Sequence, residues 1–262
     1  MVLTAARRAV GVLNALRGGL GFLSRLPVGH DEKSWSAFRR QPAAFPLVGY
    51  MIGVLLAAPL FVLRPGTTAA AAFLVWVYLL TGVSHADAVT DLGDALAVHG
   101  DPEKRRSVMR DTAVGVGGVL ALGLVLTTLA LAAVQLAETA LEGEIAAVFA
   151  IVVASEVGAK AAMATVVCLG EATHEGLGSA LTAESGSRSL VPVLIAVIPV
   201  AGLTLVTPAA PVSTVAALLA SVAVLRVART TFGGVSGDVI GATNEVARVV
   251  ALHAGVMLWT LS

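Results

Sequence analysis

Charged residues are scarce in this sequence. They make up 13% of the 262 residues, whereas hydrophobic residues make up 57%. This charged share is roughly half that of an ordinary soluble domain. A soluble fold of this length would need far more polar residues to cover its surface, so the composition excludes a soluble protein. The same apolar character, together with a net charge of zero, excludes an intrinsically disordered chain.

Cysteine is almost absent, because Cys168 is the single one in the sequence. A disulfide framework and a thiolate metal site are therefore excluded. The 17 basic and 17 acidic residues leave no overall basic field, which argues against nucleic-acid binding. A secretory signal peptide is also not predicted, since Arg17 interrupts the first apolar stretch and no small-residue cleavage site follows. With a mean hydropathy of +0.89, the chain is predicted to be a polytopic membrane protein.

The predicted fold is all-α, with about seven transmembrane helices in a single domain over residues 1–262. Each predicted span has the ~17–25 apolar residues that a helix needs to cross a bilayer. Open sheets cannot span lipid, and the alternating pattern of a barrel is missing. The predicted spans are 44–63, 68–85, 113–136, 144–168, 189–206, 212–230 and 239–261. Residues 9–26 are predicted to form an amphipathic helix at the membrane surface.

The distribution of lysine and arginine predicts the orientation of these spans. Of the 17 basic residues, 14 fall on the same side as the N-terminus, Arg64 falls on the other side, and Lys160 and Arg248 lie within spans. Cytoplasmic loops of membrane proteins are enriched in basic residues. We therefore expect a plasma-membrane protein with its N-terminus in the cytoplasm and its C-terminus outside.

Three aspartates follow the second predicted span at helical spacing. Asp87, Asp91 and Asp94 stand at i, i+4 and i+7, which places them within roughly 60° of one another on one helix face. Three carboxylates on one stripe repel each other unless a cation lies between them. Oxygen ligands without cysteine or clustered histidine suit Mg²⁺ or Mn²⁺. The alternative is a solvated acidic loop, which is disfavoured because apolar residues continue through the segment.

A basic segment comes next. Asp101 followed by Pro102 is typical of a helix start, with an N-cap and a proline at the first helical position. Arg106 and Arg110 are four residues apart on the same face, an arrangement that suits binding of phosphate. Asp111 has two interpretations, as the N-cap of the third span or as a residue of the site.

The fourth predicted span contains Glu156 and Lys160 at i, i+4 in apolar surroundings. An intramembrane ion pair explains them as well as a phosphate-binding role of Lys160 does. His174 follows this span and is interpreted as a surface histidine.

A glycine-rich segment, residues 233–245, opens the last predicted span. Glycines before a helix start leave backbone N–H groups free to bind phosphate. Asp238 and Glu245 lie on one face, and Gly241 and Ala242 between them favour close approach of another helix. The alternative is helix packing by small residues with Asp238 as an N-cap. The predicted substrate-binding residues in this segment are Ser236, Gly237 and Asn244.

All of these polar clusters fall at cytoplasmic helix ends in the topology that the basic residues predict. The convergence indicates one site, open to the cytoplasm, for a divalent metal and a phosphate-bearing substrate.

Several motifs, in the same order, resemble those of the cobalamin synthase family. The resemblance runs nearly end to end and is carried by residues 22–28, 45–53, 85–95, 108–115, 175–178 and 233–242. The clearest are the aspartate stripe, Val108-Met109-Arg110-Asp111, and Gly233-Gly-Val-Ser-Gly237-Asp238. The family's glycines after the first and third aspartates are Ala88 and Ala95 here, and Lys160 stands where the family often has a Ser-Arg pair.

The resemblance implies a phosphoryl transfer between adenosylcobinamide-GDP and α-ribazole or its 5′-phosphate. GMP leaves, and adenosylcobalamin or its 5′-phosphate forms. By this resemblance, Mg²⁺ is the expected cofactor, with Asp87, Asp91, Asp94 and Asp238 as its ligands. Asp94 is the expected general base, with Asp91 and Asp111 as further catalytic candidates. Arg106, Arg110 and Lys160 are the expected phosphate-binding residues.

Two other functions are considered. A cation-coupled secondary transporter also has membrane carboxylates, but its site is expected at the midplane rather than beside a basic helix at one membrane face. A CDP-alcohol phosphotransferase normally carries an Asp-x-x-Asp-Gly-x-x-Ala-Arg pattern, which this sequence lacks. The lipid bilayer is the expected environment in each case, and homo-oligomerisation is left open.

Overall fold

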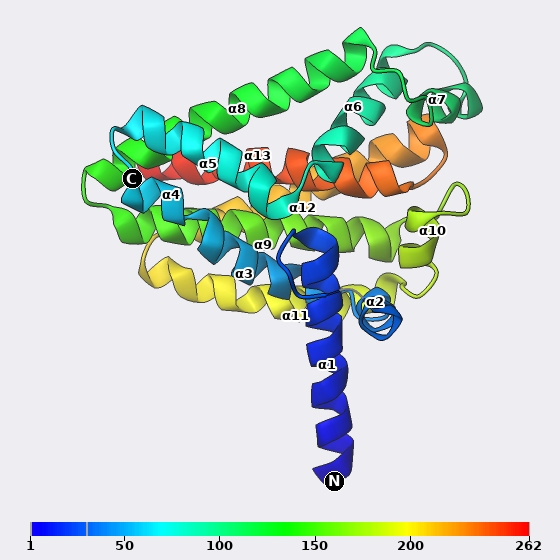
Figure 1. Cartoon of the computed structure of the whole chain (residues 1–262), viewed down its shortest axis with the longest axis horizontal. Coiled ribbons are helices and arrows are strands. Elements are labelled where there is room, and N and C mark those ends of the chain that lie inside the picture. The colour runs from blue at the N-terminus through cyan, green and yellow to red at the C-terminus, as the bar shows by residue number, and fades with distance from the viewer. Residues whose placement is uncertain (1, 30, 262) are drawn as a thin grey trace.

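The computed structural model describes residues 2–29 and 31–261, with side chains described from residue 9 onward. The described chain is helical, and an isolated bridge between Ala172 and Val235 is its single β-type pairing. The long axes of the longest helices run along the molecule (Figure 1). The elements are α1 (Val2–Leu23), α2 (Glu32–Arg39), α3 (Ala44–Leu56), α4 (Ala58–Val62), α5 (Gly66–Thr81), α6 (Ser84–Ala97), α7 (Pro102–Met109), α8 (Val116–Leu141), α9 (Ile145–Leu169), α10 (Leu177–Thr182), η1 (Ser187–Ser189), α11 (Leu190–Val197), η2 (Ile198–Leu205), α12 (Ala209–Val227), η3 (Ala228–Phe232) and α13 (Gly237–Leu261).

Five helical segments of the described chain are long and apolar enough to cross a bilayer. They are Ala44–Val62, Val116–Leu141, Ile145–Leu169, Ser187–Leu205 and Ala209–Phe232. They agree with five of the predicted spans. The count becomes six if α5 and α6, which are bent by 96° at a short break, form one span. The predicted total of seven is therefore not confirmed.

The predicted span 68–85 ends in a sharp bend instead of continuing as a straight helix. Gly82 lies at the break with φ 77° and ψ −177°, a conformation that favours glycine because it has no Cβ. α6 begins two residues later and turns away from α5 (Figure 1). This bend carries the three aspartates of α6 to one end of the bundle.

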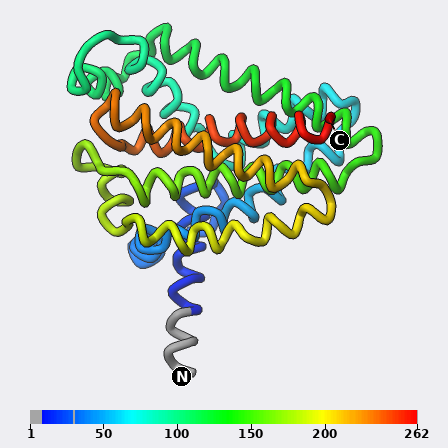
Figure 2. Tube along the Cα trace, turned by 180° about the vertical axis from the view of Figure 1, so that it is seen from behind, coloured from blue at the N-terminus to red at the C-terminus, as the bar shows by residue number. Residues whose placement is uncertain are grey.

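The last predicted span, 239–261, corresponds to the 25-residue helix α13. It is not among the apolar spans, because Asn244, Glu245 and Arg248 interrupt its hydrophobic run. These three side chains are fully buried inside the protein rather than exposed to lipid. α13 packs against α6, α8, α9 and α12, and Figure 2 shows it from the side on which α12 lies.

Helix α9 lies at the centre of the bundle, with buried residues along almost its whole length. It packs against α3, α12 and α13. The approach of α3 is close, since a Cβ at Gly49 would lie 2.9 Å from the Cα of Val157. Small residues at helix interfaces of this kind allow dense packing in a membrane.

Helix α1 runs crosswise to the long helices and projects from the bundle (Figure 1). Its last turn and α2 enclose an aromatic group in which Phe38 contacts Phe22, Trp35 and Phe45 at centroid distances of 5.6, 6.0 and 4.6 Å. The predicted helix 9–26 is thus present, ending at Leu23. Its crosswise direction agrees with a position at the membrane surface, which stays a prediction.

The two ends of the bundle differ in the elements that they carry. α2, α7 and α10 lie at one end, and the turns 63–65 and 142–144 and the C-terminal end of α13 lie at the other (Figure 1). The polar clusters identified in the sequence therefore gather at the α7–α10 end. Their predicted position in the cytoplasm stays a prediction.

Candidate active site

A cavity of about 780 Å³ opens between the N-terminal helices and the pair α6–α13. One wall comes from α1, the segment after it and α2. The other comes from α6, α13, Met163 of α9 and the segment around His174. This volume is within the range of small-molecule binding sites, which is about 300–1,000 Å³.

Two of the four predicted aspartates line this cavity, Asp87 on α6 and Asp238 on α13. Asp91 lies within electrostatic reach of Asp87, Asp94 and Asp238, so the structure brings all four carboxylates into one region. The predicted close approach at Gly241 is confirmed: a Cβ there would lie 2.8 Å from the Cβ of Ala88. The absence of a side chain at position 241 therefore lets α6 approach α13.

Asp94 has a structural role that the sequence analysis missed. Its Oδ2 accepts a hydrogen bond from the Gly115 N–H at 2.7 Å, and its Oδ1 accepts one from the Gly118 N–H at 2.8 Å. The carboxylate thus satisfies free N–H groups at the start of α8. Each oxygen thus has a hydrogen-bond donor from the backbone, and Asp94 does not line the cavity; its predicted role as general base stays a prediction.

Asp111 was given two interpretations, and the structure excludes one of them. The N-cap of α8 is Gly115, so Asp111 does not cap this helix. Its Oδ1 instead accepts a hydrogen bond from the Ala113 N–H at 3.1 Å in the exposed segment before the helix. The prediction that Asp101 caps α7 is confirmed, since its carboxylate accepts from the Lys104 N–H at 2.8 Å.

The described residues contain no group of three or more His, Cys, Asp or Glu placed to hold a metal ion by themselves. A cage of four aspartates is therefore not formed. The donor chemistry still fits Mg²⁺, because this ion keeps several waters and usually takes one or two carboxylates together with substrate phosphate oxygens. Asp87 faces the cavity with an exposed carboxylate, and Asp91 is half-buried one turn further along α6.

The glycine-rich segment before α13 is tied to the segment after α9. The Val235 N–H donates to the Glu171 carbonyl at 2.7 Å, and the Thr173 N–H donates to the Val235 carbonyl at 3.1 Å. The N–H groups of Gly233 and Gly234 both donate to the Ala228 carbonyl. Gly233 and Gly234 therefore do not leave their N–H groups free for phosphate, and the predicted phosphate contact of Gly237 stays a prediction.

Ser236 is the capping residue of α13, and Asp238 is not. The Ser236 hydroxyl accepts from the Val239 N–H at 3.3 Å and donates to the Asp238 carboxylate, also at 3.3 Å. Asp238 lies in the first turn of the helix, where a negative charge is favourable. The structure therefore places Asp238 and Gly237 at the cavity and leaves Ser236 buried behind them.

The two arginines of the basic segment differ in their surroundings. Arg106 donates through Nη1 to the Phe232 carbonyl at 2.7 Å, which connects α7 to the end of η3. Arg110 ends α7 and is exposed. Neither lines the cavity in the structure, and their predicted contact with phosphate stays a prediction.

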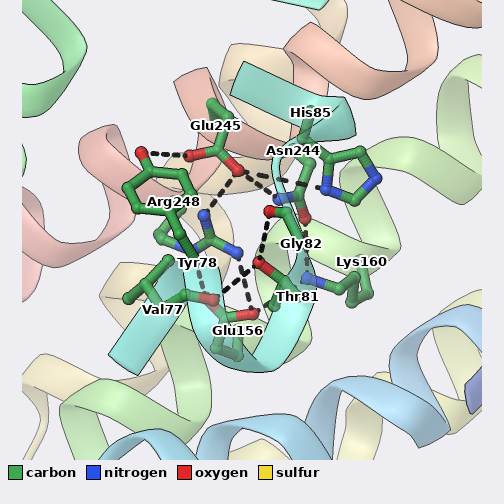
Figure 3. Close-up of polar contacts among 10 residues, drawn as sticks. All are labelled: Val77, Tyr78, Thr81, Gly82, His85, Glu156, Lys160, Asn244, Glu245 and Arg248. Carbon is green, nitrogen blue, oxygen red and sulfur yellow. Dashed lines mark hydrogen bonds and ion pairs between the residues drawn. The ribbon is translucent and has the colours of Figure 1, made fainter. Parts of the chain in front are cut away.

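A buried network of charged side chains lies beneath the cavity (Figure 3). Arg248 donates through Nε to Glu156 and through Nη1 to Glu245, the latter at 2.6 Å. Lys160 donates to Glu156 at 2.9 Å and to the Asn244 side-chain oxygen at 2.7 Å. The two cations and two carboxylates balance, which buried ionised groups require. The predicted Glu156–Lys160 ion pair is thus confirmed, and Lys160 and Asn244 lie in this network rather than on the cavity wall.

His85 connects this network to the cavity. Its ring lines the cavity, and its Nδ1 lies 4.0 Å from Glu245 Oε1, as Figure 3 shows. Tyr78, before the bend, donates its hydroxyl to Glu245 at 3.3 Å. Sequence reasoning missed these contacts of Glu245 because the partners are far apart in the chain. The i, i+3 spacing of Glu245 and Arg248 inside an apolar helix was the one sequence feature that could have indicated a buried ion pair there.

Comparisons with known proteins agree on one family. The profile of the cobalamin-5-phosphate synthase family matches residues 15–256. An adenosylcobinamide-GDP ribazoletransferase of Halorubrum lacusprofundi is 54% identical, over 95% of this chain and 99% of its own. Proteins of the same name from Haloquadratum walsbyi and Methanocella arvoryzae are 43% and 33% identical, over 95% and 96% of this chain and 100% and 98% of their own. No solved structure matches the chain.

Proposed function

The chain belongs to the cobalamin-5-phosphate synthase family, and we propose that it is the ribazoletransferase that its relatives are named for. It transfers the cobinamide phosphate of adenosylcobinamide-GDP to α-ribazole or α-ribazole 5′-phosphate and releases GMP. The observation that carries this proposal is the cavity lined by Asp87 and Asp238, in a chain similar to these enzymes over nearly its full length. The relatives do not favour a lipid phosphotransferase or a transporter.

The reaction is a displacement at phosphorus. A ribose hydroxyl oxygen of α-ribazole attacks the phosphorus next to cobinamide, and the bond from this phosphorus to the GMP oxygen breaks. The hydroxyl proton passes to a carboxylate, and GMP leaves with the electron pair of the broken bond. We assign the proton to Asp238, because it lines the cavity on the helix opposite Asp87, whereas Asp94 is occupied at the start of α8.

Mg²⁺ is proposed as the cofactor, held by Asp87 and Asp91 together with phosphate oxygens of the substrate. When bound, it supplies positive charge that neutralises the pyrophosphate and the departing GMP. Positioning and charge neutralisation are the main sources of catalysis in phosphoryl transfer. Arg106 and Arg110 are proposed to bind substrate phosphate, and Lys160 to be a counter-ion within the buried network.

The proposed membrane arrangement places this site in the cytoplasm. α13 is taken as a further span despite its polar residues, because the neighbouring helices cover them. The plasma membrane then contains seven spans if the bent pair α5–α6 counts as one. The basic residues of α2 and α7 lie on the cytoplasmic side.

The proposed activity is tested with the purified protein, adenosylcobinamide-GDP, α-ribazole and Mg²⁺, by measuring GMP release and cobalamin formation. Asp87→Asn is expected to lower turnover about a hundredfold or more, because it removes a charged ligand at the reacting phosphates. The matched control is Asp101→Asn, since asparagine caps a helix as well as aspartate does and Asp101 lies outside the cavity. Absence of GMP release from folded wild-type protein would contradict the assignment.

A further inference from the structure

The wall of the cavity opposite the aspartates is aromatic. Phe22 of α1 and Trp35 of α2 both line the cavity, and their ring centroids are 5.4 Å apart. The Arg39 guanidinium lies 5.6 Å from the Trp35 ring centroid, and Phe38 packs beside both rings from the core. Both rings are partly exposed, which leaves aromatic surface open to a ligand. The cavity thus has an acidic wall suited to phosphate and metal and an aromatic wall suited to a planar ring.

The aromatic wall is held in place by polar contacts at the start of α2. Asp31 caps this helix by accepting from the Ser34 N–H at 2.7 Å, and its other oxygen forms an ion pair with Arg17 at 3.0 Å. The hydrogen bond from the Ser34 N–H lowers the pKa of the Asp31 carboxyl group. Arg17 also donates to the Val28 carbonyl at 2.8 Å. These contacts connect α1 to the start of α2, and both oxygens of the Asp31 carboxylate take part in them.

Glu32 differs from Asp31 because its carboxylate makes few contacts with the protein. It lines the cavity, its side chain is 81% exposed, and its nearest cation, Arg39, is 3.7 Å away. Exposed ion pairs of this length contribute little energy, so the carboxylate is free to accept hydrogen bonds from a ligand. Glu32 stands three residues before Trp35, on the same face of α2.

We propose that this wall binds the guanine base of the nucleotide donor, by stacking on Phe22 and Trp35 and by hydrogen bonds to Glu32. This inference rests on the proposed function, since it assigns the pyrophosphate and the guanine of adenosylcobinamide-GDP to the two walls. Guanine carries N1–H and N2–H donors on one edge, which a carboxylate accepts as a pair. Stacking of a base on an aromatic side chain is worth about 1–3 kcal/mol. The benzimidazole base of α-ribazole has no N–H donor, so the carboxylate favours guanine over this alternative.

The first experiment measures inhibition of the wild-type protein and its variants by GMP, IMP and AMP. IMP lacks the N2 amino group and AMP lacks both donors. The wild type is expected to bind GMP more tightly than IMP, and IMP more tightly than AMP. Glu32→Gln is expected to weaken GMP binding about tenfold and to remove most of this preference, with an equal rise in KM for adenosylcobinamide-GDP and little change in kcat.

The matched control is Glu184→Gln, because Glu184 also forms an exposed ion pair of 3.7 Å, with Arg40, and lies outside the cavity. Trp35→Leu is expected to raise KM for the donor about tenfold, and Trp35→Phe to retain stacking with less than a threefold rise. The KM for α-ribazole is expected to stay unchanged in every variant. A merely structural role of α2 would alter kcat or stability without changing the preference among the three nucleotides.

Direct binding of GMP by equilibrium dialysis separates this proposal from the proposed function. Glu32-dependent GMP binding by a protein without transferase activity would support the subsite and contradict the reaction. Normal turnover with unchanged nucleotide preference in Glu32→Gln would overturn the subsite and leave the reaction intact. A rise in KM for α-ribazole alone would also overturn it, since the wall would then hold the acceptor.

Discussion

Arg248 joins the two carboxylates of the buried network. It is fully buried and contacts two carboxylates, Glu156 of α9 and Glu245 on its own helix. A buried carboxylate that loses its cation is left with an uncompensated charge in a medium of low dielectric constant. Arg248 therefore stabilises the contact between α9 and α13 mainly by preventing this penalty.

We expect Arg248→Met to destabilise the protein by about 3 kcal/mol or more, because two buried carboxylates would share a single cation, Lys160. For a protein of this size the melting temperature would fall by roughly 6 °C or more. Thermal unfolding in detergent measures the shift. Arg226→Met is the control, because Arg226 is an exposed cation near the end of α12. Adding Glu156→Gln to Arg248→Met restores the charge balance and is expected to recover part of the lost stability. Equal melting temperatures for Arg248→Met and Arg226→Met would contradict the role of the network.

The sequence predicted part of this network, for a local reason. Glu156 and Lys160 are four residues apart in one helix, so their proximity follows from helical geometry alone. The contact between Arg248 and Glu156 joins residues 92 positions apart, and its formation depends on how α9 and α13 pack. Spacing also identified the aspartates of α6, but it could not show that Asp94 turns toward the start of α8.

At the scale of elements, the site depends on the contact between α6 and α13. Asp87 and Asp238 come from these two helices, and Gly241 and Ala88 lie where the helices are in close contact. The small residues in the sequence predicted this approach. The 96° bend between α5 and α6 was not predicted, because the apolar run continues through Gly82 and only the left-handed backbone there marks the break.

We expect Gly241→Ala to lower turnover about tenfold with a smaller effect on stability. The new Cβ would lie 2.8 Å from the Cβ of Ala88, so α6 would shift and carry Asp87 away from Asp238. Displacements of this order in a catalytic site are costly to rate. GMP release and melting temperature report the two effects separately.

Two further variants make this prediction specific. Gly123→Ala is the control, because a Cβ there meets nothing within 4 Å and alanine favours the helix. Combining Gly241→Ala with Ala88→Gly removes the clashing methyl group and is expected to restore most of the turnover. Failure of the double variant to recover would show that the loss has another cause than the distance between α6 and α13.

At the scale of the whole molecule, residues remote in sequence meet at one end of the helix bundle. The acidic stripe of α6, the basic helix α7, the segment around His174 and the start of α13 all lie there (Figure 1). The positions of the basic residues predicted that these segments lie together. They set the topology of the spans, and in that topology every polar segment connects spans on the same side of the membrane. The aromatic wall was not predicted, since α2 is short and polar and its position over the cavity depends on how α1 packs on α3.

The orientation of the bundle leads to a prediction that uses the single cysteine of the sequence. In a Cys168→Ala background, Glu142→Cys in the α8–α9 turn is expected to react with a membrane-impermeant thiol reagent in intact cells. Lys104→Cys on α7 is expected to react only after the membrane is opened, because α7 lies at the proposed cytoplasmic end with the basic residues. Both positions are exposed, so a difference in reactivity between them reports sidedness rather than burial. Reaction of Lys104→Cys in intact cells, with Glu142→Cys protected, would reverse the orientation and place the site outside. GMP release by each variant verifies that the labelled protein is folded.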